Sequence, residues 1–208
     1  MAPRSIKVYS DYKSPYAYLA KDLAYQLERE TGAVLDWLPY TLDIPSYLGS
    51  AQVDASGNVV EASRNAHQWR RVKYSYMDCR REANRRGLTI LGPRKIFDSS
   101  LANIGMLYAK RHGTFRAYHD RVFERFWRRE LDIESQEAVA AVLSECGADA
   151  TGFAAFLYGD GRRGLEEIMH EAEEAGVFGV PSFLLEDGDL YWGREHLPRI
   201  RELISAET

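Results

Sequence analysis

A serine at the start of an expected helix is the first residue whose type and position could support chemistry. The segment Asp-Tyr-Lys-Ser-Pro-Tyr covers residues 11–16 and places Ser14 directly before Pro15. A serine at this position is a good helix N-cap, because its oxygen accepts a backbone N–H that has no partner within the helix. The same helix end also stabilises an anion such as a thiolate, to which a serine hydroxyl can donate. The segment alone leaves both roles open.

A proline near the C-terminus is the second such residue. The segment Gly-Val-Phe-Gly-Val-Pro-Ser-Phe covers residues 176–183 and contains Val180 followed by Pro181. A trans proline at the start of an edge strand is the commoner arrangement. A cis peptide bond would instead turn the backbone of Val180 outward, where its N–H and C=O could pair with an extended, peptide-like ligand.

Two further segments carry charged side chains in patterns that fit a polar ligand. In Tyr-Trp-Gly-Arg-Glu-His-Leu, residues 191–197, Glu195 lies in the first helical turn after Gly193. A carboxylate there either interacts with the helix dipole or, with nearby N–H groups, binds the charged ends of an α-amino acid. In residues 65–87, steps of three and four residues put four side chains on one helix face: Arg71, Tyr74, Asp78 and Arg81. This face is either solvated or lines a pocket for an acidic substrate.

Other kinds of site have no support in the sequence. The two cysteines, Cys79 and Cys146, form no C-x-x-C or C-x-x-H pattern, which excludes a disulfide framework and gives no support for zinc. The five histidines have no metal-like spacing. Hydrolase, nucleotide-hydrolase and dinucleotide-binding motifs are absent as well, so we predict no metal site and none of these activities.

The composition is that of an ordinary globular protein of 208 residues, with 45% hydrophobic and 28% charged residues. The net charge of −4 argues against a nucleic-acid-binding protein. The N-terminus has no apolar leader region, and no apolar run approaches the length of a membrane span. We therefore expect a reduced, cytoplasmic protein without a membrane segment.

The elements that position these residues follow from hydrophobic spacing. A strand–helix–strand opening is expected over 5–9, 15–30 and 33–38, with parallel strands. Residues 41–60 lose periodicity and are expected to form a loop or lid. Helices follow at 65–86, 100–112, 114–128, 135–146, 151–157 and 162–175. Strands at 180–186 and 189–193 flank an Asp-Gly hairpin signal, and a helix ends the chain at 195–204.

These motifs, in this order, closely resemble the family of 2-hydroxychromene-2-carboxylate isomerases and kappa-class glutathione transferases, which is related to disulfide-bond oxidoreductases. The resemblance covers nearly the whole chain. It implies an α/β fold in which a thioredoxin-like domain, residues 1–42 and 172–208, is interrupted by an α-helical domain, residues 43–171. It also implies a homodimer.

The resemblance further implies glutathione as the cofactor and assigns residues to it. Ser14 would lie beside the glutathione sulfur as the catalytic residue, Pro181 would be cis, and Val180 would pair with the cysteinyl backbone. The remaining cofactor residues would be Arg194, Glu195, Asp78 and Asn65. By the same resemblance, Tyr74 and Asn103 would face the substrate. From their residue types alone, we expect Lys13 or Arg71 to bind the substrate carboxylate, and Tyr12, Tyr40 and Trp192 to bound an apolar acceptor pocket.

The chain departs from related proteins at Glu195 and Lys13, and it also differs from the disulfide-bond oxidoreductases. Lys13, next to Ser14, adds a positive charge that could favour a thiolate or a substrate carboxylate, or it points to water. The slot that holds a C-x-x-C motif in the oxidoreductases reads Ser14-Pro15-Tyr16-Ala17, and without a thiol it cannot perform dithiol exchange. Related chains commonly read Gly-x-Asp-Arg where this one reads Gly193-Arg194-Glu195-His196. Glu195 can still accept from an ammonium group, although its side chain is one methylene longer.

The sequence therefore predicts a glutathione-dependent isomerase in which a thiolate adds reversibly to an aromatic 2-oxo acid. Two alternatives remain open at this point. One is a kappa-class-like transferase or peroxidase that acts on another electrophile with the same thiolate. The other is a non-catalytic thioredoxin-like module that binds peptides beside Pro181. Aromatic compound catabolism is suggested by the resemblance alone.

Overall fold

A four-stranded sheet forms the centre of the computed structural model, which describes residues 4–206. Strand β1 (Ser5–Ser10) pairs in parallel with β2 (Val34–Pro39) and antiparallel with β5 (Ser182–Leu184), and β5 pairs antiparallel with β6 (Leu190–Trp192). The strand order is therefore β2-β1-β5-β6. The two ends of the chain thus build one sheet, although about 140 residues separate β2 from β5.

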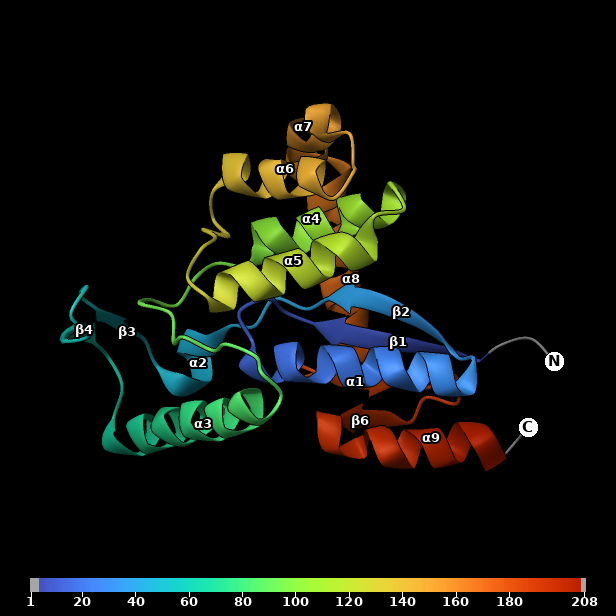
Figure 1. Cartoon of the computed structure of the whole chain (residues 1–208), viewed down its shortest axis with the longest axis horizontal. Coiled ribbons are helices and arrows are strands. Elements are labelled where there is room, and N and C mark those ends of the chain that lie inside the picture. Colours follow the sequence, from blue (N-terminus) through green and yellow to red (C-terminus); the bar gives the residue numbers. More distant parts are fainter. Residues whose placement is uncertain (1–3, 207–208) are drawn as a thin grey trace.

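Helices α1 (Pro15–Thr31) and α9 (Leu197–Ala206) cover one face of this sheet (Figure 1). Their apolar stripes bury Leu27 and Ile200 against sheet residues such as Val8 and Phe183. Helix α1 ends at Gly32, whose φ of 71° is the left-handed conformation that glycine adopts most readily. Because α1 begins directly after β1, its N-terminus lies at the carboxyl end of that strand.

The opposite face is covered by the helical part of the chain. It contains α4 (Ser100–Arg111), α5 (Phe115–Trp127), α6 (Gln136–Glu145), the short 3-10 helix η1 (Ala150–Gly152), α7 (Phe153–Tyr158) and α8 (Asp160–Glu174). Large aromatic side chains, among them Tyr118, Phe123 and Trp127, are fully buried here and join the helices to the sheet in one core.

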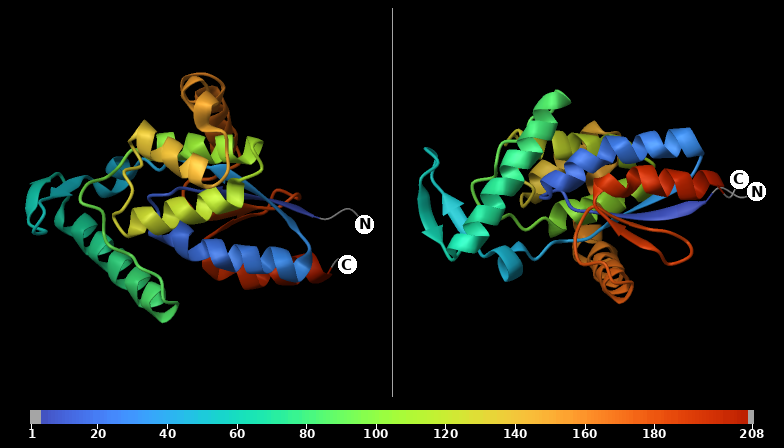
Figure 2. Two further views of the ribbon diagram at one scale, coloured as in Figure 1. Left: turned by 45° about the horizontal axis from the view of Figure 1, so that its top comes forward. Right: turned by 90° about the horizontal axis from the view of Figure 1, so that it is seen from below.

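The segment between β2 and α4 forms an arm beside this body (Figure 2). It consists of α2 (Ile44–Leu48), the hairpin β3 (Ala51–Val53) with β4 (Val59–Ala62), and the long helix α3 (Ala66–Arg85). The expectation of a loop over 41–60 is therefore wrong, whereas a role of this segment as a lid over the site stays a prediction. Pro45 is compatible with the first turn of a short helix. Gly57, at φ 89°, lies in the turn of a hairpin whose strands are too short to show a periodic pattern.

The other expected elements are present, with small differences at their ends. Strand β5 starts only at Ser182, and β2 includes Pro39 as its last residue. The final helix is preceded by the 3-10 turn η2 (Arg194–His196). The thioredoxin-like fold with a helical insertion is confirmed, whereas the exact domain limits stay a prediction.

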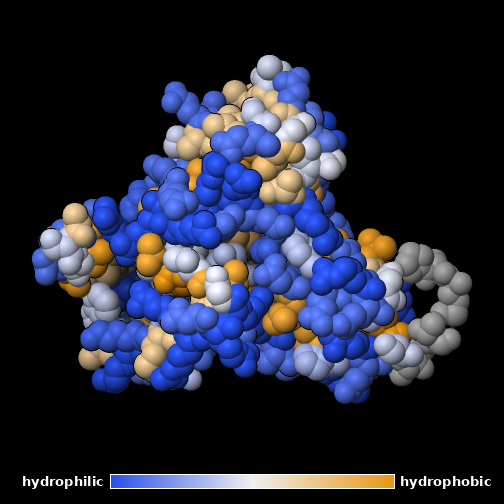
Figure 3. All heavy atoms as spheres, in the orientation of Figure 1, coloured by the Kyte–Doolittle hydropathy of each residue, from blue (hydrophilic) through white to orange (hydrophobic). Residues whose placement is uncertain are grey.

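The molecular surface is mostly hydrophilic in the view of Figure 3. Hydrophobic atoms are visible there on the β3–β4 hairpin, where Val59 and Val60 are exposed. Within residues 4–206, no helix is long and apolar enough to cross a membrane.

Candidate active site

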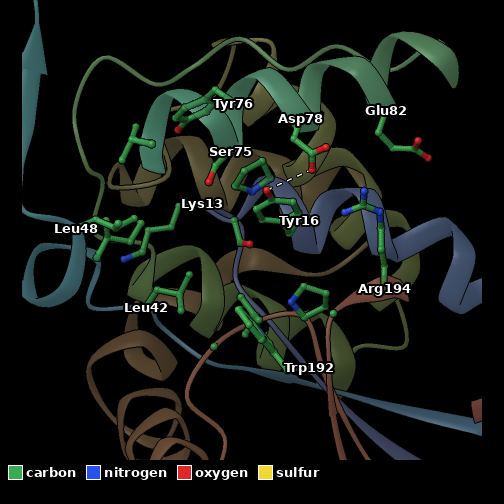
Figure 4. Close-up of a pocket in the computed structure, with 18 of the residues that line it drawn as sticks. Lys13, Tyr16, Leu42, Leu48, Ser75, Tyr76, Asp78, Glu82, Trp192 and Arg194 are labelled. Carbon is green, nitrogen blue, oxygen red and sulfur yellow. Dashed lines mark hydrogen bonds between the residues drawn. The ribbon is translucent and has the colours of Figure 1, made fainter. Parts of the chain in front are cut away.

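A pocket of about 1160 Å³ lies between the sheet domain and the arm. Four elements meet around it: the N-terminus of α1, one face of α3, the turn before β5, and η2 (Figure 4). These elements come from distant parts of the sequence, so the pocket exists only once the sheet has formed. Its size exceeds the usual upper range for a site that holds one small molecule.

Ser14 lies in this pocket as the N-cap of α1. Its Oγ accepts a hydrogen bond from the backbone N–H of Ala17 at 3.2 Å, and the residue is only 4% exposed. The next orphan donor, the backbone N–H of Tyr16, has no hydrogen-bond partner among residues 4–206. A cap and an anion site therefore coexist here, because the cap satisfies one N–H group and leaves another available.

The turn before β5 forms the neighbouring wall. The peptide bond between Val180 and Pro181 is cis, as the family resemblance implies, and both residues line the pocket. The Pro181 carbonyl accepts from the Gly193 N–H at 2.9 Å, which ties this turn to η2. The backbone N–H of Val180 donates to no group within the described residues, although the residue is only 5% exposed. A buried N–H without a partner is costly unless a ligand accepts from it.

One end of the pocket, the polar end, carries charges that are not neutralised by ion pairs within residues 4–206. Arg194 lies over the ring of Tyr16, 5.6 Å from its centroid, and Glu195 follows it on η2. Neither side chain forms a salt bridge or hydrogen bond within the described chain. Across the pocket, Asp78 of α3 accepts from the Tyr16 hydroxyl at 3.4 Å. Burial raises the pKa of Tyr16 to about 12, so this phenol stays protonated and remains a donor.

Gly193 allows the Glu195 side chain to fold back over the turn. A Cβ atom at residue 193 would lie 2.5 Å from both carboxylate oxygens of Glu195, and the φ of 109° is one that residues with side chains rarely adopt. The glycine is therefore required both for the backbone conformation and for the place of the carboxylate.

The other end of the pocket, the apolar end, is formed by α2, α3 and the segment that joins α3 to α4. Its walls consist mainly of hydrophobic side chains: Leu42, Ile44, Leu48, Val72, Tyr76, Ile96, Phe97 and Phe126. Lys13 reaches this end from the turn before Ser14, and Figure 4 shows it beside Leu42 and Leu48. Its side chain is 6% exposed. A cation thus lies among apolar side chains, next to the position where Ser14 faces the pocket.

The structure brings most of the predicted site residues together. The pocket is lined by Lys13, Ser14, Arg71, Asp78, Val180, Pro181, Arg194 and Glu195, and also by Trp192. Trp192 packs against Phe178 with ring centroids 5.0 Å apart, and both rings are more than half exposed at the pocket. The roles of these residues in binding and catalysis stay predictions. The residues come from three segments that are far apart in the sequence, and folding brings them to one pocket.

Two tyrosines predicted to bound the pocket lie elsewhere. Tyr12 is fully buried, and its hydroxyl forms a hydrogen bond of 3.1 Å with Nδ1 of His119. Tyr40 is directed into the core, where its hydroxyl donates to the Val177 carbonyl at 3.2 Å. Both predictions are wrong, because each tyrosine side chain is packed in the core and its hydroxyl is paired there.

The predictions for two residues of the α3 segment are also wrong. Tyr74 is 57% exposed and does not line the pocket. The stripe that faces the pocket is Arg71, Ser75, Asp78, Glu82 and Arg85, which is rotated from the face that includes Tyr74 and Arg81. Asn65 is the N-cap of α3, and its side chain is engaged in a capping box with Gln68. It is exposed and does not line the pocket.

Asn103 lies behind the pocket wall rather than in it. It is fully buried, and its amide nitrogen is 2.8 Å from the Thr41 hydroxyl and 3.4 Å from Asp11 Oδ1. This placement reveals a residue that sequence reasoning missed, the buried Asp11. A polar residue at the carboxyl end of a parallel strand, three positions before Ser14, was the available signal.

The cysteines do not take part in the pocket. Cys79 is fully buried, and burial raises the pKa of its thiol to about 12, which keeps it neutral. Cys146 follows α6, far along the chain from the pocket elements. Among the described residues, no group of three or more histidine, cysteine, aspartate or glutamate side chains could hold a metal ion.

Comparison with known proteins shows the family of the fold. The profile of the DSBA-like thioredoxin domain matches residues 5–205. The chain belongs to this family. Within it, the oxidoreductase slot at the start of α1 holds Ser14 and Ala17 in place of cysteines, so membership does not bring dithiol chemistry with it.

Several of the relatives are named as isomerases. The chain is 29% identical to the 2-hydroxychromene-2-carboxylate isomerase of Pseudomonas putida over 196 residues, covering 92% of this chain and 90% of the relative. It is 27% identical to the enzyme of the same name from Sphingobium xenophagum, covering 93% and 94% of the two chains. A solved structure of 2-hydroxychromene-2-carboxylate isomerase superposes with a TM-score of 0.75 at 25% identity, covering 97% and 95%. The similarity to these isomerases thus extends over the whole fold.

Proposed function

We propose that this protein is a glutathione-dependent isomerase that acts on an aromatic 2-oxo acid of the 2-hydroxychromene-2-carboxylate type. The proposal rests on a turn that can stabilise a thiolate but contains no cysteine. Ser14 and the free N–H of Tyr16 face a pocket in which no cysteine of the protein is placed to react. A thiolate supplied by a cofactor fits this arrangement.

The residues around Ser14 fit a glutathione molecule. The partnerless N–H of Val180 matches the carbonyl of a peptide-like ligand. At the polar end, Glu195 suits an ammonium group and Arg194 suits a carboxylate, so together they fit the γ-glutamyl group of glutathione. Asp78, on the opposite wall, supplies a second carboxylate that could accept from the same ammonium.

Glutathione, when bound, supplies a thiolate nucleophile that adds reversibly to a conjugated carbon and then leaves, so that substrate and product have the same mass. The chain would support this chemistry in three ways. The Ser14 hydroxyl and the Tyr16 N–H stabilise negative charge on the sulfur. Lys13 and Arg71 orient the substrate carboxylate. The apolar end holds the aromatic part and limits access of water.

The names of the relatives favour isomerisation over conjugation or reduction. A transferase would release an addition product, and a peroxidase would release glutathione disulfide. Mass spectrometry of the product distinguishes these outcomes, because only an isomerase returns a product of unchanged mass and regenerates glutathione. A peptide-binding module would leave both molecules unchanged.

The decisive experiment is a titration of the protein with glutathione at neutral pH, monitored by the ultraviolet absorbance of the thiolate. We expect a thiolate signal with the natural protein and its loss in Ser14→Ala. Turnover should fall on the order of 100- to 1000-fold, as is typical when one donor to a developing anion is removed.

The chain offers a matched control for the helix cap. Ser135 caps α6 with the same geometry, accepting from Ala138 N–H at 3.2 Å, and it lies outside the pocket. Ser135→Ala should cost a similar stability, about 1 kcal/mol, with no change in the thiolate signal. If added glutathione gives no thiolate signal, or if Ser14→Ala retains full activity, the proposed function is wrong.

A further inference from the structure

Asp11 is a fully buried carboxyl group directly behind the pocket wall. Its Oδ2 accepts from the backbone N–H of Leu42 at 2.8 Å, and its Oδ1 accepts from the backbone N–H of Lys13 at 3.3 Å. It thereby connects the turn that carries Ser14 to the wall of the apolar end. The reaction proposed above gives no role to this group, although an isolated buried carboxylate is costly.

Lys13 is the charged partner of Asp11, but the pair is loose. The distance from Lys13 Nζ to Asp11 Oδ2 is 3.9 Å, longer than a hydrogen bond, and both side chains are buried, with exposures of 6% and 0%. Lys13 lines the pocket, where Figure 4 shows its side chain beside Leu42 and Leu48, whereas Asp11 does not line it. A ligand can therefore reach the cation from the side opposite Asp11.

The groups around Asp11 and Lys13 are mostly neutral. Burial raises the pKa of Asp11 above its ordinary value, although Lys13 and the Leu42 N–H act in the opposite direction. Asn103 and Ser99 contribute neutral donors from the α4 side. The other titratable groups that interact with Asp11 are Tyr12 and Tyr47, and Tyr47 in turn interacts with Asp43 and with Arg71 of α3. Both tyrosines have pKa values raised by burial and stay neutral.

One buried ammonium group cannot compensate two carboxylates equally well. When a second carboxylate approaches Lys13 in a poorly solvated site, the two negative groups repel each other, and the one with the less favourable environment takes up a proton. Asp11 is that group, because it is the more deeply buried of the two. Its protonated form keeps the hydrogen bonds from Leu42 and Lys13, one on the carbonyl oxygen and a weaker one on the hydroxyl oxygen, because both oxygens of a carboxylic acid have acceptor capacity.

We propose that the Asp11–Lys13 pair is a charge-regulated subsite for the carboxylate of the acceptor: an anionic ligand takes the Lys13 ammonium as its partner while Asp11 takes up one proton from the buffer. Lys13 thus selects anionic over neutral acceptors, and Asp11 acts through Lys13 as a positioning residue. The identity of the ligand as the acceptor rests on the proposed function, but the binding event requires neither glutathione nor turnover.

The test measures binding of 2-naphthoate and of its methyl ester, a neutral ligand of the same shape, by calorimetry with and without glutathione. Titrations in buffers of different ionisation enthalpy report the number of protons taken up. We expect uptake approaching one proton with 2-naphthoate and none with the ester. By linkage, the affinity for 2-naphthoate should rise as pH falls, by up to about tenfold per pH unit, while that for the ester stays constant.

Two variants separate the roles of the pair. Asp11→Asn cannot take up the proton, so 2-naphthoate should bind with no proton uptake and with a flat pH profile. Lys13→Met removes the cation, so the preference for 2-naphthoate over the ester should fall at least about tenfold, as expected for one lost charge-assisted contact. Lys73→Met, at an exposed position of α3 outside the pocket, removes the same charge and should change neither quantity.

The outcomes are distinguishable from those for the proposed function. The inference is overturned if 2-naphthoate binds without proton uptake, if Lys13→Met keeps the preference, or if 2-naphthoate fails to bind both with and without glutathione. Should Asp11→Asn unfold, which thermal denaturation reports, Lys13→Met and the natural protein still decide the matter. A missing thiolate signal would refute the cofactor assignment and leave this subsite intact.

Discussion

The two ends of the pocket use charge in opposite ways. At the polar end, Arg194 and Glu195 lie on a short turn, accessible to water and without ion pairs in the described chain. At the apolar end, Lys13 is buried and already has Asp11 as a partner. Exposed charges cost little to keep unpaired and gain strength when a ligand displaces water from them. A buried pair is costly to desolvate, so its presence is weak evidence for a contribution to stability.

Replacing the glycine at the polar end should have the largest effect on ligand binding. Gly193→Ala forces a side chain onto a φ of 109° and places its Cβ on the Glu195 carboxylate, which must swing away. We expect the dissociation constant for glutathione to rise on the order of 100-fold, from the combined backbone strain and lost charged contacts. Binding of an aromatic acid at the apolar end should be unaffected.

The adjacent hairpin contains the control for strain alone. Gly188 has a φ of 90°, and a Cβ added there meets nothing within 4 Å. Gly188→Ala should therefore lower the melting temperature without weakening glutathione binding. Equal loss of glutathione affinity in both variants would show that Gly193 acts only on general stability.

Removing only the charge of Glu195 should have a smaller effect on glutathione binding. Glu195→Gln keeps the shape of the side chain but loses the carboxylate, so we expect glutathione to bind about tenfold more weakly. We attribute this weaker binding to the lost contact between Glu195 and the ammonium of the γ-glutamyl group. This explanation can be tested directly. A glutathione analogue without this ammonium should bind the natural protein and the variant equally. If the variant weakens both ligands alike, Glu195 holds another part of the ligand.

Much of the fold could be predicted because its signals are local. Ser14 before Pro15, Gly32 after an apolar stripe, and Asp187-Gly188 between two short strands each define an element end through the conformation that the residue allows. The hairpin at 51–62 could not be predicted in this way. Its strands are short, and all four residues of β4 are exposed, so no alternation marks them.

The site was harder to predict, because it depends on which way each side chain points. Tyr12 and Lys13 are neighbours in sequence, yet one is buried against His119 and the other reaches the pocket. On α3, a rotation of one position along the helix surface separates the exposed Tyr74 from Ser75, which lines the pocket. Asp11 was missed because its importance comes from burial, and burial is a property of the folded chain.

Shortening a side chain at the apolar end should give the smallest of these effects, confined to the acceptor. Leu48 lines the pocket beside Lys13, and Leu48→Ala removes apolar contact area without touching a charge. At about 25 cal/mol per Å² for a partly covered side chain, we expect the KM for the aromatic acid to rise about fivefold. Glutathione affinity and the proton uptake with 2-naphthoate should stay as in the natural protein.

Leu91 provides the matched control for this change, because it is a leucine of the α3–α4 segment that is 42% exposed and does not line the pocket. Leu91→Ala should leave the KM for the aromatic acid unchanged. If Leu48→Ala instead weakens glutathione as much as the acid, the two ends are not separate binding regions. The aromatic acid would then share the polar end, and the apolar end would serve only to close the pocket.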